Sequence, residues 1–239
     1  MTFNLRQRRR EPEWMDHPGL DPALHDGALS SLSRLNRWAG SDGILWPAIR
    51  DLAASSPGRE CRVLDIATGA GDVPMALSRR AKRCGLHLDI TAVDLSPHAV
   101  DYARRNAADS GAKITLRQCD VLCEDLPEGE WEVVMCSLFL HHLDEAQAVR
   151  LLGRMGAASK GLVLVSDLRR SMAGLWLTHL AARVVSRSPV VRVDGPRSVR
   201  AAFTLAEAAS LAGRAGWTNF QVRPLWPFRF LLMERKGGS

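Results

Sequence analysis

From residue 61 onward, apolar runs alternate with stretches of helical periodicity, and this alternation restricts the fold more than any other feature of the chain. The runs are continuous and are not interrupted by polar residues, which is typical of strands buried on both faces. Helices between them would cover both faces of a parallel, doubly wound α/β sheet. The expected strands span residues 61–67, 88–96, 114–120, 131–140 and 160–168, and the expected helices span 72–84, 97–111 and 144–159.

The C-terminal segment breaks this rhythm. A helix is expected in 204–217, where Thr204 and Glu207 have the spacing of a capping box. Two further strands, at 219–225 and 228–236, are separated by only two residues, which is too short for a parallel crossover. We therefore expect a Rossmann-like, seven-stranded and mostly parallel sheet that ends in an antiparallel hairpin.

Residues 1–56 are expected to form an N-terminal helical cap ahead of the main domain, which spans 57–239. The first helix of the cap begins with Asp21 as its N-cap and a proline at the first helical position. A second helix is expected in 43–56. A further helix, around 171–200, is inserted between the fifth strand and the last helix, where it can cover a substrate.

The length of 239 residues suits one large α/β domain. No uninterrupted run of about 18 apolar residues is present, and no apolar segment follows the basic N-terminus, so we expect neither a membrane-spanning nor a secreted protein. The five cysteines are odd in number and mostly embedded in apolar segments, which favours reduced thiols and a cytoplasmic location. Cys119 and Cys123 lack a second Cys or His pair, so no metal is expected.

The formal net charge of +6 is distributed unevenly, because arginines gather in two places. We interpret them as solvated side chains of a free terminus and of a loop. Attraction to RNA, phosphate or an anionic membrane surface is the second interpretation. The two groups are Arg6, Arg8, Arg9 and Arg10, and Arg183, Arg187, Arg192, Arg197 and Arg200.

The segment "RVLDIATGAGDVP" joins the first strand to the first helix of the alternating pattern. Gly69 and Gly71 allow the backbone to turn sharply and to approach a ligand at the positive end of the helix. A dinucleotide fingerprint needs a third glycine, and Pro74 stands in its place. Asp65 and Asp72 would repel a pyrophosphate but favour a cationic ligand such as S-adenosylmethionine, which carries a sulfonium and an ammonium group.

Residues 61–170 resemble the core of class I S-adenosylmethionine-dependent methyltransferases. "VLDIATGAGD" is similar to their first motif, with Thr68 where glycine or cysteine is more usual, and "TAVDLS", "QCDV" and "CSLFLHHL" resemble the motifs that follow. The resemblance implies that S-adenosylmethionine is the cofactor and that Asp94 accepts its ribose hydroxyls. It implies the following cofactor-binding residues: Asp65, Ala67, Thr68, Gly69, Gly71, Asp94, Leu95, Cys119, Asp120, Val121 and Ser137.

The whole chain is similar to one branch of this family. That branch includes ubiquinone/menaquinone-biosynthesis methyltransferases and bacterial small-molecule methyltransferases found with aromatic polyketide enzymes. This resemblance implies O-methylation of a phenol, quinol or aromatic polyketide hydroxyl on a hydrophobic small molecule. C-methylation of a quinone precursor ring, RNA methylation and an inactive cofactor-binding partner subunit are alternatives. The turn "SLFLHH" lacks the Asn/Asp-Pro-Pro-aromatic pattern of exocyclic-amine methyltransferases, which argues against a nucleic-acid substrate. A monomer or homodimer with peripheral membrane contact is compatible with this function.

Candidate catalytic residues end the fourth and fifth expected strands, because ligands of such sheets bind at the carboxyl ends of the strands. They are His141, His142 and Asp167, and a base is needed where the methyl acceptor must lose a proton. A metal-assisted mechanism is less supported, since only Asp167 is obviously placed as an oxygen ligand. The substrate-binding candidates are Trp14, Trp38, Trp176, His179 and Arg183.

Overall fold

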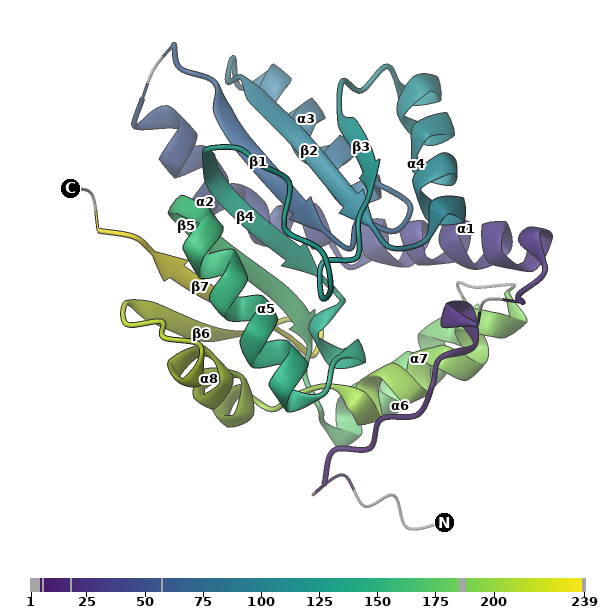
Figure 1. Cartoon of the computed structure of the whole chain (residues 1–239). Helices are drawn as coiled ribbons and strands as arrows, with labels where there is room; N and C mark the ends of the chain where they lie inside the picture. The colour runs from purple at the N-terminus through teal and green to yellow at the C-terminus, as the bar shows by residue number, and fades with distance from the viewer. Residues whose placement is uncertain (1–4, 6, 18, 57, 185–187, 238–239) are drawn as a thin grey trace.

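The computed structural model describes residues 5, 7–17, 19–56, 58–184 and 188–237, and within them a seven-stranded sheet has the order β3-β2-β1-β4-β5-β7-β6 (Figure 1). Strands β1 to β5 are parallel, and β7 is antiparallel to both β5 and β6. The predicted doubly wound sheet with a terminal hairpin is therefore confirmed. The strands are β1 (Cys61–Ile66), β2 (Leu88–Asp94), β3 (Thr115–Gln118), β4 (Trp131–Ser137), β5 (Ser159–Leu168), β6 (Phe220–Leu225) and β7 (Arg229–Arg235).

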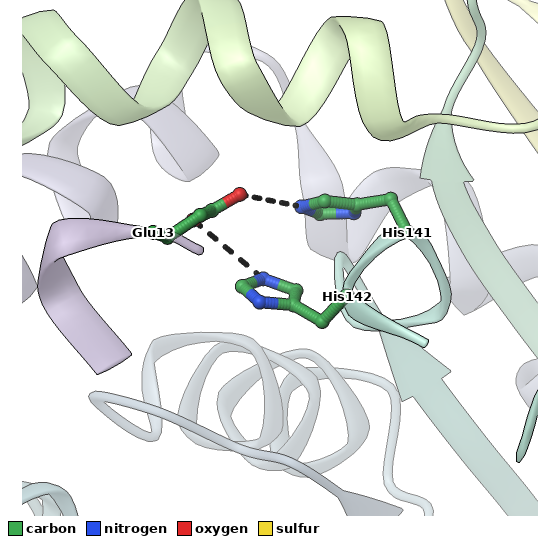
Figure 2. A group of neighbouring side chains, drawn as sticks. All are labelled: Glu13, His141 and His142. Atoms are coloured by element: carbon green, nitrogen blue, oxygen red, sulfur yellow. Dashed lines mark ion pairs between the residues drawn. The ribbon is translucent and has the colours of Figure 1, made fainter. Parts of the chain in front are cut away.

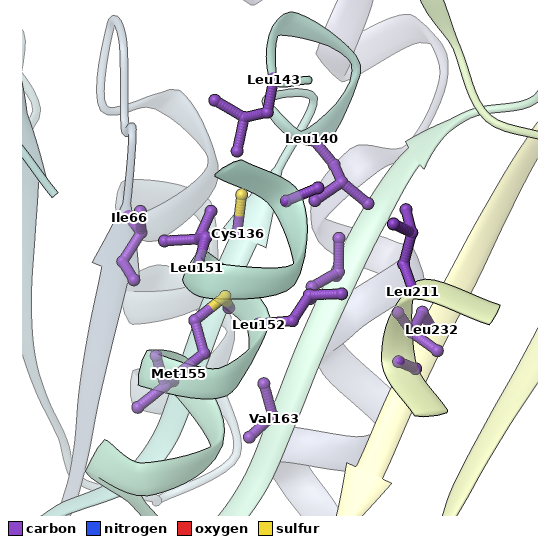
Figure 3. Close-up of a cluster of buried hydrophobic side chains, with 14 of the residues drawn as sticks. Ile66, Cys136, Leu140, Leu143, Leu151, Leu152, Met155, Val163, Leu211 and Leu232 are labelled. Carbon is purple, nitrogen blue, oxygen red and sulfur yellow. The ribbon is translucent and has the colours of Figure 1, made fainter. Parts of the chain in front are cut away.

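Both faces of the sheet are covered, which explains the continuous apolar runs. On β1, Leu64 belongs to the core beneath α5 and α8, whereas Val63 belongs to the core beneath α2 and α3. Figure 3 shows the first of these cores, with Leu151 and Met155 of α5 packed on the strands. The helices around the sheet are α1 (Pro22–Trp38), α2 (Ser41–Ala54), α3 (Asp72–Arg83), α4 (Pro97–Ser110), α5 (Glu145–Ala158) and α8 (Leu205–Arg214).

The helix ends follow local rules. The side chain of Asp21 accepts hydrogen bonds from the first backbone N–H groups of α1, as its sequence position predicts. The capping box of Thr204 and Glu207 is present at α8. Because α2 contributes Leu45 and Ile49 to the core of the sheet, this helix is packed as part of the main domain, while the domain boundary at residue 56 stays a prediction.

The insertion after β5 differs from the sequence-based expectation of one helix. In its described part, α6 (Met172–Val184) and α7 (Pro189–Ala201) pack against each other. The sequence did not predict α7 because this helix runs through Gly195 and Pro196, residues that usually interrupt helices. Among the described residues, no helix has both the length and the apolarity needed to cross a bilayer.

The N-terminal segment formed by residues 5 and 7–17 is here called the strap; it lies along α7 (Figure 1) and includes the short 3-10 helix η1 (Trp14–Asp16). The Arg9 N–H donates to the Arg200 carbonyl, and the Arg8 side chain donates to the carbonyls of Ala201 and His141. The interpretation of a free terminus with solvated arginines is therefore wrong for Arg8, because its guanidinium satisfies carbonyls at the ends of other elements. Arg6 and Arg187 lie outside the described residues.

Candidate functional site

A cavity of about 1070 Å³ lies over the carboxyl ends of the parallel strands, where doubly wound sheets bind their ligands. Its floor is formed by the loops after β1, β2, β3 and β4. Leu29 and Leu32 of α1, Leu177 of α6 and Val199 of α7 close it from above, together with the strap. The cavity therefore has one end over the glycine turn and another beneath the inserted helices.

The turn after β1 adopts a backbone conformation that favours glycine at two positions. Gly69 and Gly71 have φ values of 55° and 73°, in the left-handed region. A Cβ on Gly71 would lie 3.1 Å from the Cβ of Ala103, so this glycine also lets α3 approach α4. Ala67, Thr68 and Gly69 line the cavity, whereas Gly71 acts behind it through the shape of the turn.

Three carboxyl groups surround this turn, and burial raises the pKa of each. The pKa of Asp65 rises to about 7, mainly through burial, and the nearby charges of Asp72 and Asp94 act in the same direction. The pKa values of Asp72 and Asp94 are also raised by burial. A cation beside them would favour their ionised forms, so this end of the cavity suits a positively charged ligand. Asp65 itself lies behind the cavity wall and acts through its charge.

Asp94, at the end of β2, is fixed by two backbone donors. Its Oδ2 accepts from Gly69 N at 2.8 Å, and its Oδ1 accepts from Ser96 N at 2.9 Å. Each carboxylate oxygen keeps a further lone pair for a ligand hydroxyl. Asp94 and Leu95 both line the cavity, so the geometry is compatible with the predicted ribose contact.

The loop after β3 forms the adjoining wall through Cys119, Asp120 and Val121. Asp120 Oδ1 accepts from Leu122 N at 2.9 Å and from Cys123 N at 3.3 Å, and these backbone donors lower the pKa of Asp120. Its other oxygen stays available for a ligand amine. Ser137, at the end of β4, lines the neighbouring part of the cavity. All the predicted cofactor residues except Asp65 and Gly71 therefore reach the cavity surface, and their individual contacts stay predictions.

The 3-10 helix η2 (Leu140–His142) brings His141 against the end of β5. His141 Nδ1 lies 2.7 Å from Asp167 Oδ1, and His141 N donates to Asp167 Oδ2 at 3.0 Å. Both side chains are buried. Although burial alone raises it, the charge and hydrogen bond of His141 lower the pKa of Asp167 below its ordinary value. An ionised Asp167 only accepts, so His141 carries its proton on Nδ1 when neutral and exposes a lone pair on Nε2.

His142 occupies a different electrostatic environment. Its Nδ1 lies 3.0 Å from Asp16 Oδ2 of the strap, and its Nε2 lies 3.8 Å from Glu13 Oε2. Burial alone lowers the pKa of His142, but Asp16 and Glu13 outweigh burial and raise it to about 9. His142 is therefore a cation at neutral pH, whereas its neighbour His141 is held by the buried Asp167.

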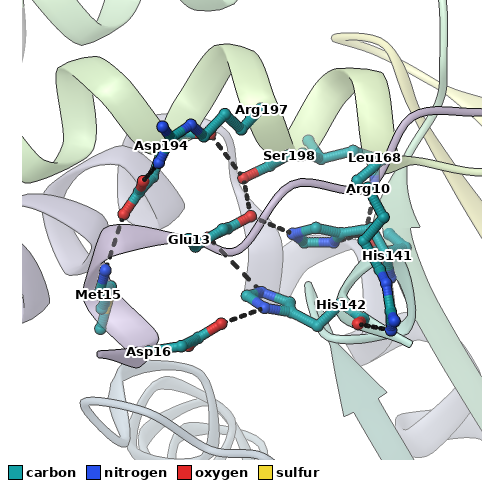
Figure 4. Close-up of polar contacts among 12 residues, drawn as sticks. Arg10, Glu13, Met15, Asp16, His141, His142, Leu168, Asp194, Arg197 and Ser198 are labelled. Atoms are coloured by element: carbon teal, nitrogen blue, oxygen red, sulfur yellow. Dashed lines mark hydrogen bonds and ion pairs between the residues drawn. The ribbon is translucent and has the colours of Figure 1, made fainter. Parts of the chain in front are cut away.

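The strap contributes Glu13, a residue that the sequence analysis did not select. Glu13 Oε1 lies 3.7 Å from His141 Nε2 and accepts from the Ser198 hydroxyl of α7, and Figure 4 shows this network. The strap is fixed nearby by Asp194, which accepts from the N–H groups of Trp14 and Met15. Glu13 lies far from the histidines along the chain, so no local motif could have predicted the contact.

Glu13, His141 and His142 each offer a ligand atom, and these atoms lie within 4.8 Å of one another (Figure 2). Each histidine also has a carboxylate at Nδ1, an arrangement that orients Nε2 for metal ligation in many proteins. The cluster therefore has the residue types that can hold a divalent transition metal, with the Glu13 carboxylate 3.7 Å from His141 Nε2 and 3.8 Å from His142 Nε2.

The predicted substrate residues divide into two groups. Trp38 lines the cavity, at the end of α1. Trp14, Trp176, His179 and Arg183 do not line it, so the structure does not bring them to a ligand there. On α6, residues 176, 179 and 183 share one face through helical spacing, whereas the face with Leu177, Thr178 and Ala181 is turned to the cavity.

Comparisons with known proteins show what the chain is similar to. A family model described as "Methyltransferase domain" matches residues 63–160. A ubiquinone biosynthesis O-methyltransferase of Xanthomonas axonopodis pv. citri (strain 306) is 27% identical over 175 residues, which cover 69% of this chain and 70% of that protein.

Solved structures share the fold at low sequence identity. A SAM dependent methyltransferase from Aquifex aeolicus has a TM-score of 0.61 and 18% identity, covering 90% of this chain and 98% of that chain. An O-methyltransferase from neocarzinostatin biosynthesis, in complex with S-adenosyl-L-homocysteine and 1,4-dihydroxy-2-naphthoic acid, has a TM-score of 0.67 and 21% identity. The match covers 93% of this chain and 61% of the neocarzinostatin enzyme. The matched domain, the curated relative and the sheet topology together support a class I S-adenosylmethionine-dependent methyltransferase.

Proposed function

We propose that the protein transfers a methyl group from S-adenosylmethionine to a phenol-type hydroxyl of an apolar aromatic small molecule, with His141 as the general base. The observation that carries this proposal is the buried Asp167–His141 pair at 2.7 Å, with the histidine in the wall of the cofactor cavity. A phenol has a pKa near 10, so its proton must leave for the oxygen to attack efficiently at neutral pH.

The proposed step is an in-line displacement. The acceptor oxygen bonds to the methyl carbon, the bond between that carbon and the sulfonium sulfur breaks, and the phenolic proton passes to His141 Nε2. The products are a methyl ether and S-adenosylhomocysteine, and the proton then leaves to water. Asp167 orients the imidazole and stabilises its protonated form. His142, with a pKa of about 9, adds positive charge beside the developing phenolate and is already protonated, so it is not the base.

The cavity wall supports an apolar aromatic acceptor. Leu177, Phe139 and Phe228 line the cavity together with aliphatic residues of α1 and α7. Such walls bind the flat face of an aromatic ring through burial and ring packing. The curated relative that acts in ubiquinone biosynthesis and the solved relative in complex with a dihydroxynaphthoic acid support the same acceptor class. The polyketide or quinol identity of the acceptor is part of this proposal.

A metal-assisted variant of the reaction is the second candidate, because Glu13, His141 and His142 offer converging ligand atoms. A bound divalent cation would lower the pKa of a coordinated hydroxyl and would occupy His141 Nε2. The two variants respond oppositely to a chelator. Activity that survives extensive treatment with a chelator supports His141 as the base, and activity that is lost and then restored by one added metal supports the metal-assisted variant.

The test of the proposed function is a methyl-transfer screen with purified protein, S-adenosylmethionine and phenols, quinols, hydroxynaphthoates, the matching O-methylated compounds and bulk RNA. We expect mass spectrometry to detect methylation only where a free hydroxyl is present. His141→Gln should lose activity, whereas His87→Gln, an exposed histidine outside the cavity, should retain it. Methylation of a ring carbon or of RNA, with no phenol accepted, would overturn the proposal.

A further inference from the structure

Arg229, the first residue of β7, is a buried cation in the cavity wall. It is 2% exposed and lines the cavity. Its Nη1 donates to Ser41 Oγ at 2.6 Å, and its Nη2 lies 3.5 Å from Ser137 Oγ. Its buried Nε has no hydrogen-bond partner, and none of the ion pairs in the described part of the chain includes it. A guanidinium has five N–H donors, so most of its donor capacity is unused.

Arg170 shows how this fold satisfies a buried guanidinium that has a structural role. Arg170 forms a two-point ion pair with Glu207 through both terminal nitrogens, and it also donates to the carbonyls of Leu5 and Ala202. Among the described residues, the hydrogen-bond partners of Arg229 are the hydroxyl groups of Ser41 and Ser137. A buried charge is costly unless it is paired, and none of the ion pairs in the described residues balances the charge of Arg229.

The fold places this charge in the cavity wall, beside the carboxyl end of β5. Arg229 is paired with Leu168 at the end of β5, since β7 runs antiparallel to that strand. Its guanidinium reaches Ser137 at the end of β4 and Ser41 at the start of α2. Burial lowers the pKa of Arg229 to about 10, and the fields of Asp167 and Asp72 act in the opposite direction, so the group stays charged at neutral pH.

We infer that Arg229 binds a carboxylate of a ligand in this cavity. A planar carboxylate matches the fork of N–H donors in a guanidinium, and it would supply the missing negative charge. Two ligands can present this group: the methionine end of the cofactor, or an acceptor that is a hydroxyaromatic acid. The first source depends only on S-adenosylmethionine as cofactor, and the second rests on the proposed function.

The experiment compares ligands that differ only in the carboxylate, in wild type and in Arg229→Met. Calorimetry gives the Kd of S-adenosylhomocysteine and of its decarboxylated analogue, which keeps the ammonium group. Steady-state kinetics gives the KM of a hydroxynaphthoic acid and of the corresponding naphthol. If the cofactor is the source, Arg229→Met weakens S-adenosylhomocysteine at least tenfold and leaves the analogue unchanged. If the acceptor is the source, only the KM of the acid rises at least tenfold.

Equal effects of Arg229→Met on each ligand and on its counterpart without the carboxylate would overturn the inference. If Arg229→Met does not fold, the same ligands are compared in Arg229→Lys and in wild type. For at least one pair of ligands, the Kd or KM of wild type must then be about tenfold lower for the ligand with the carboxylate than for its counterpart without it. The absence of any such preference overturns the inference as well. The calorimetric comparison needs no methyl transfer, so its result is independent of whether the proposed O-methylation is correct.

Discussion

The two ends of the cavity are built in different ways. At the end over the glycine turn, here called the glycine-turn end, the lining residues come from the short loops after β1, β2 and β3, each directly following its strand. Around His141, here called the histidine end, Glu13, His141, Asp167 and Ser198 come from four separate parts of the chain. The first end is therefore determined by local segments, and the second depends on how the strap and the inserted helices pack. The following predictions test this difference, from the largest expected effect to the smallest.

Asp167→Asn should lower kcat by about 10²–10⁴-fold while leaving cofactor binding intact. The amide can donate to His141 Nδ1, which would move the proton of the neutral imidazole to Nε2 and remove the lone pair facing the cavity. Turnover on an accepted phenol and calorimetry with S-adenosylhomocysteine measure the two quantities separately. Unchanged kcat, or a loss confined to cofactor affinity, would show that this pair is not the catalytic base.

His142→Gln should lower the free energy of unfolding by an amount that depends on pH, because it removes the ion pair between His142 and Asp16 of the strap. The folded-state pKa of His142 is about 9, above its ordinary value of 6.5, so its contribution is complete below pH 6.5 and is lost as pH rises through about 9. The contribution is at most about 3 kcal/mol. Urea unfolding at pH 6, 7.5 and 9.5 measures it. The idea fails if the variant and His87→Gln lose the same stability over this range.

Asp94→Asn should weaken cofactor binding by about 10–100-fold, because two hydrogen bonds to a charged acceptor become bonds to a neutral amide. Catalysis at saturating cofactor should change much less, since the hydrogen bonds of Asp94 within the described part of the chain are with Gly69 and Ser96 and not with His141. Calorimetry with S-adenosylhomocysteine provides the measurement. Asp89→Asn, near the start of the same strand, is the matched control and should bind like wild type.

Cofactor binding should release a fraction of a proton per protein between pH 6 and pH 7. Burial raises the pKa of Asp65 to about 7, and the cationic cofactor would lower it again on binding. Calorimetry in two buffers with different ionisation enthalpies measures this release. Asp65→Asn should abolish most of it, and an undiminished release in that variant would assign the proton to another group.

The glycine-turn end was predictable because its residues follow the strand ends. In a parallel sheet all carboxyl ends meet at one edge, so Gly69, Asp94 and Asp120 converge once the strands are recognised. His141 and Asp167 were predicted by the same argument. The argument did not reach Asp16, Glu13 or Arg229, because a strap contact and the first residue of an antiparallel strand follow no strand-end rule.

The inserted helices were the weakest part of the prediction, for a related reason. The sequence predicted an apolar helix after β5, but apolar side chains occur around the whole circumference of that helix. Trp176 was selected as an apolar residue of a helix expected to cover a substrate, whereas Leu177 and Thr178 line the cavity and Trp176 does not. Hydrophobicity alone does not determine which face of such a helix meets a ligand.

By itself, the sequence determined the sheet, its terminal hairpin and the glycine turn with its carboxylates, because strand periodicity, short links and positive-φ positions are local properties. Only the tertiary structure decided that Asp167 fixes His141, that Glu13 reaches both histidines and that Arg229 is buried with no acid partner among the residues that the structure describes. These contacts join residues that are distant in the chain, and their existence depends on the packing of whole elements.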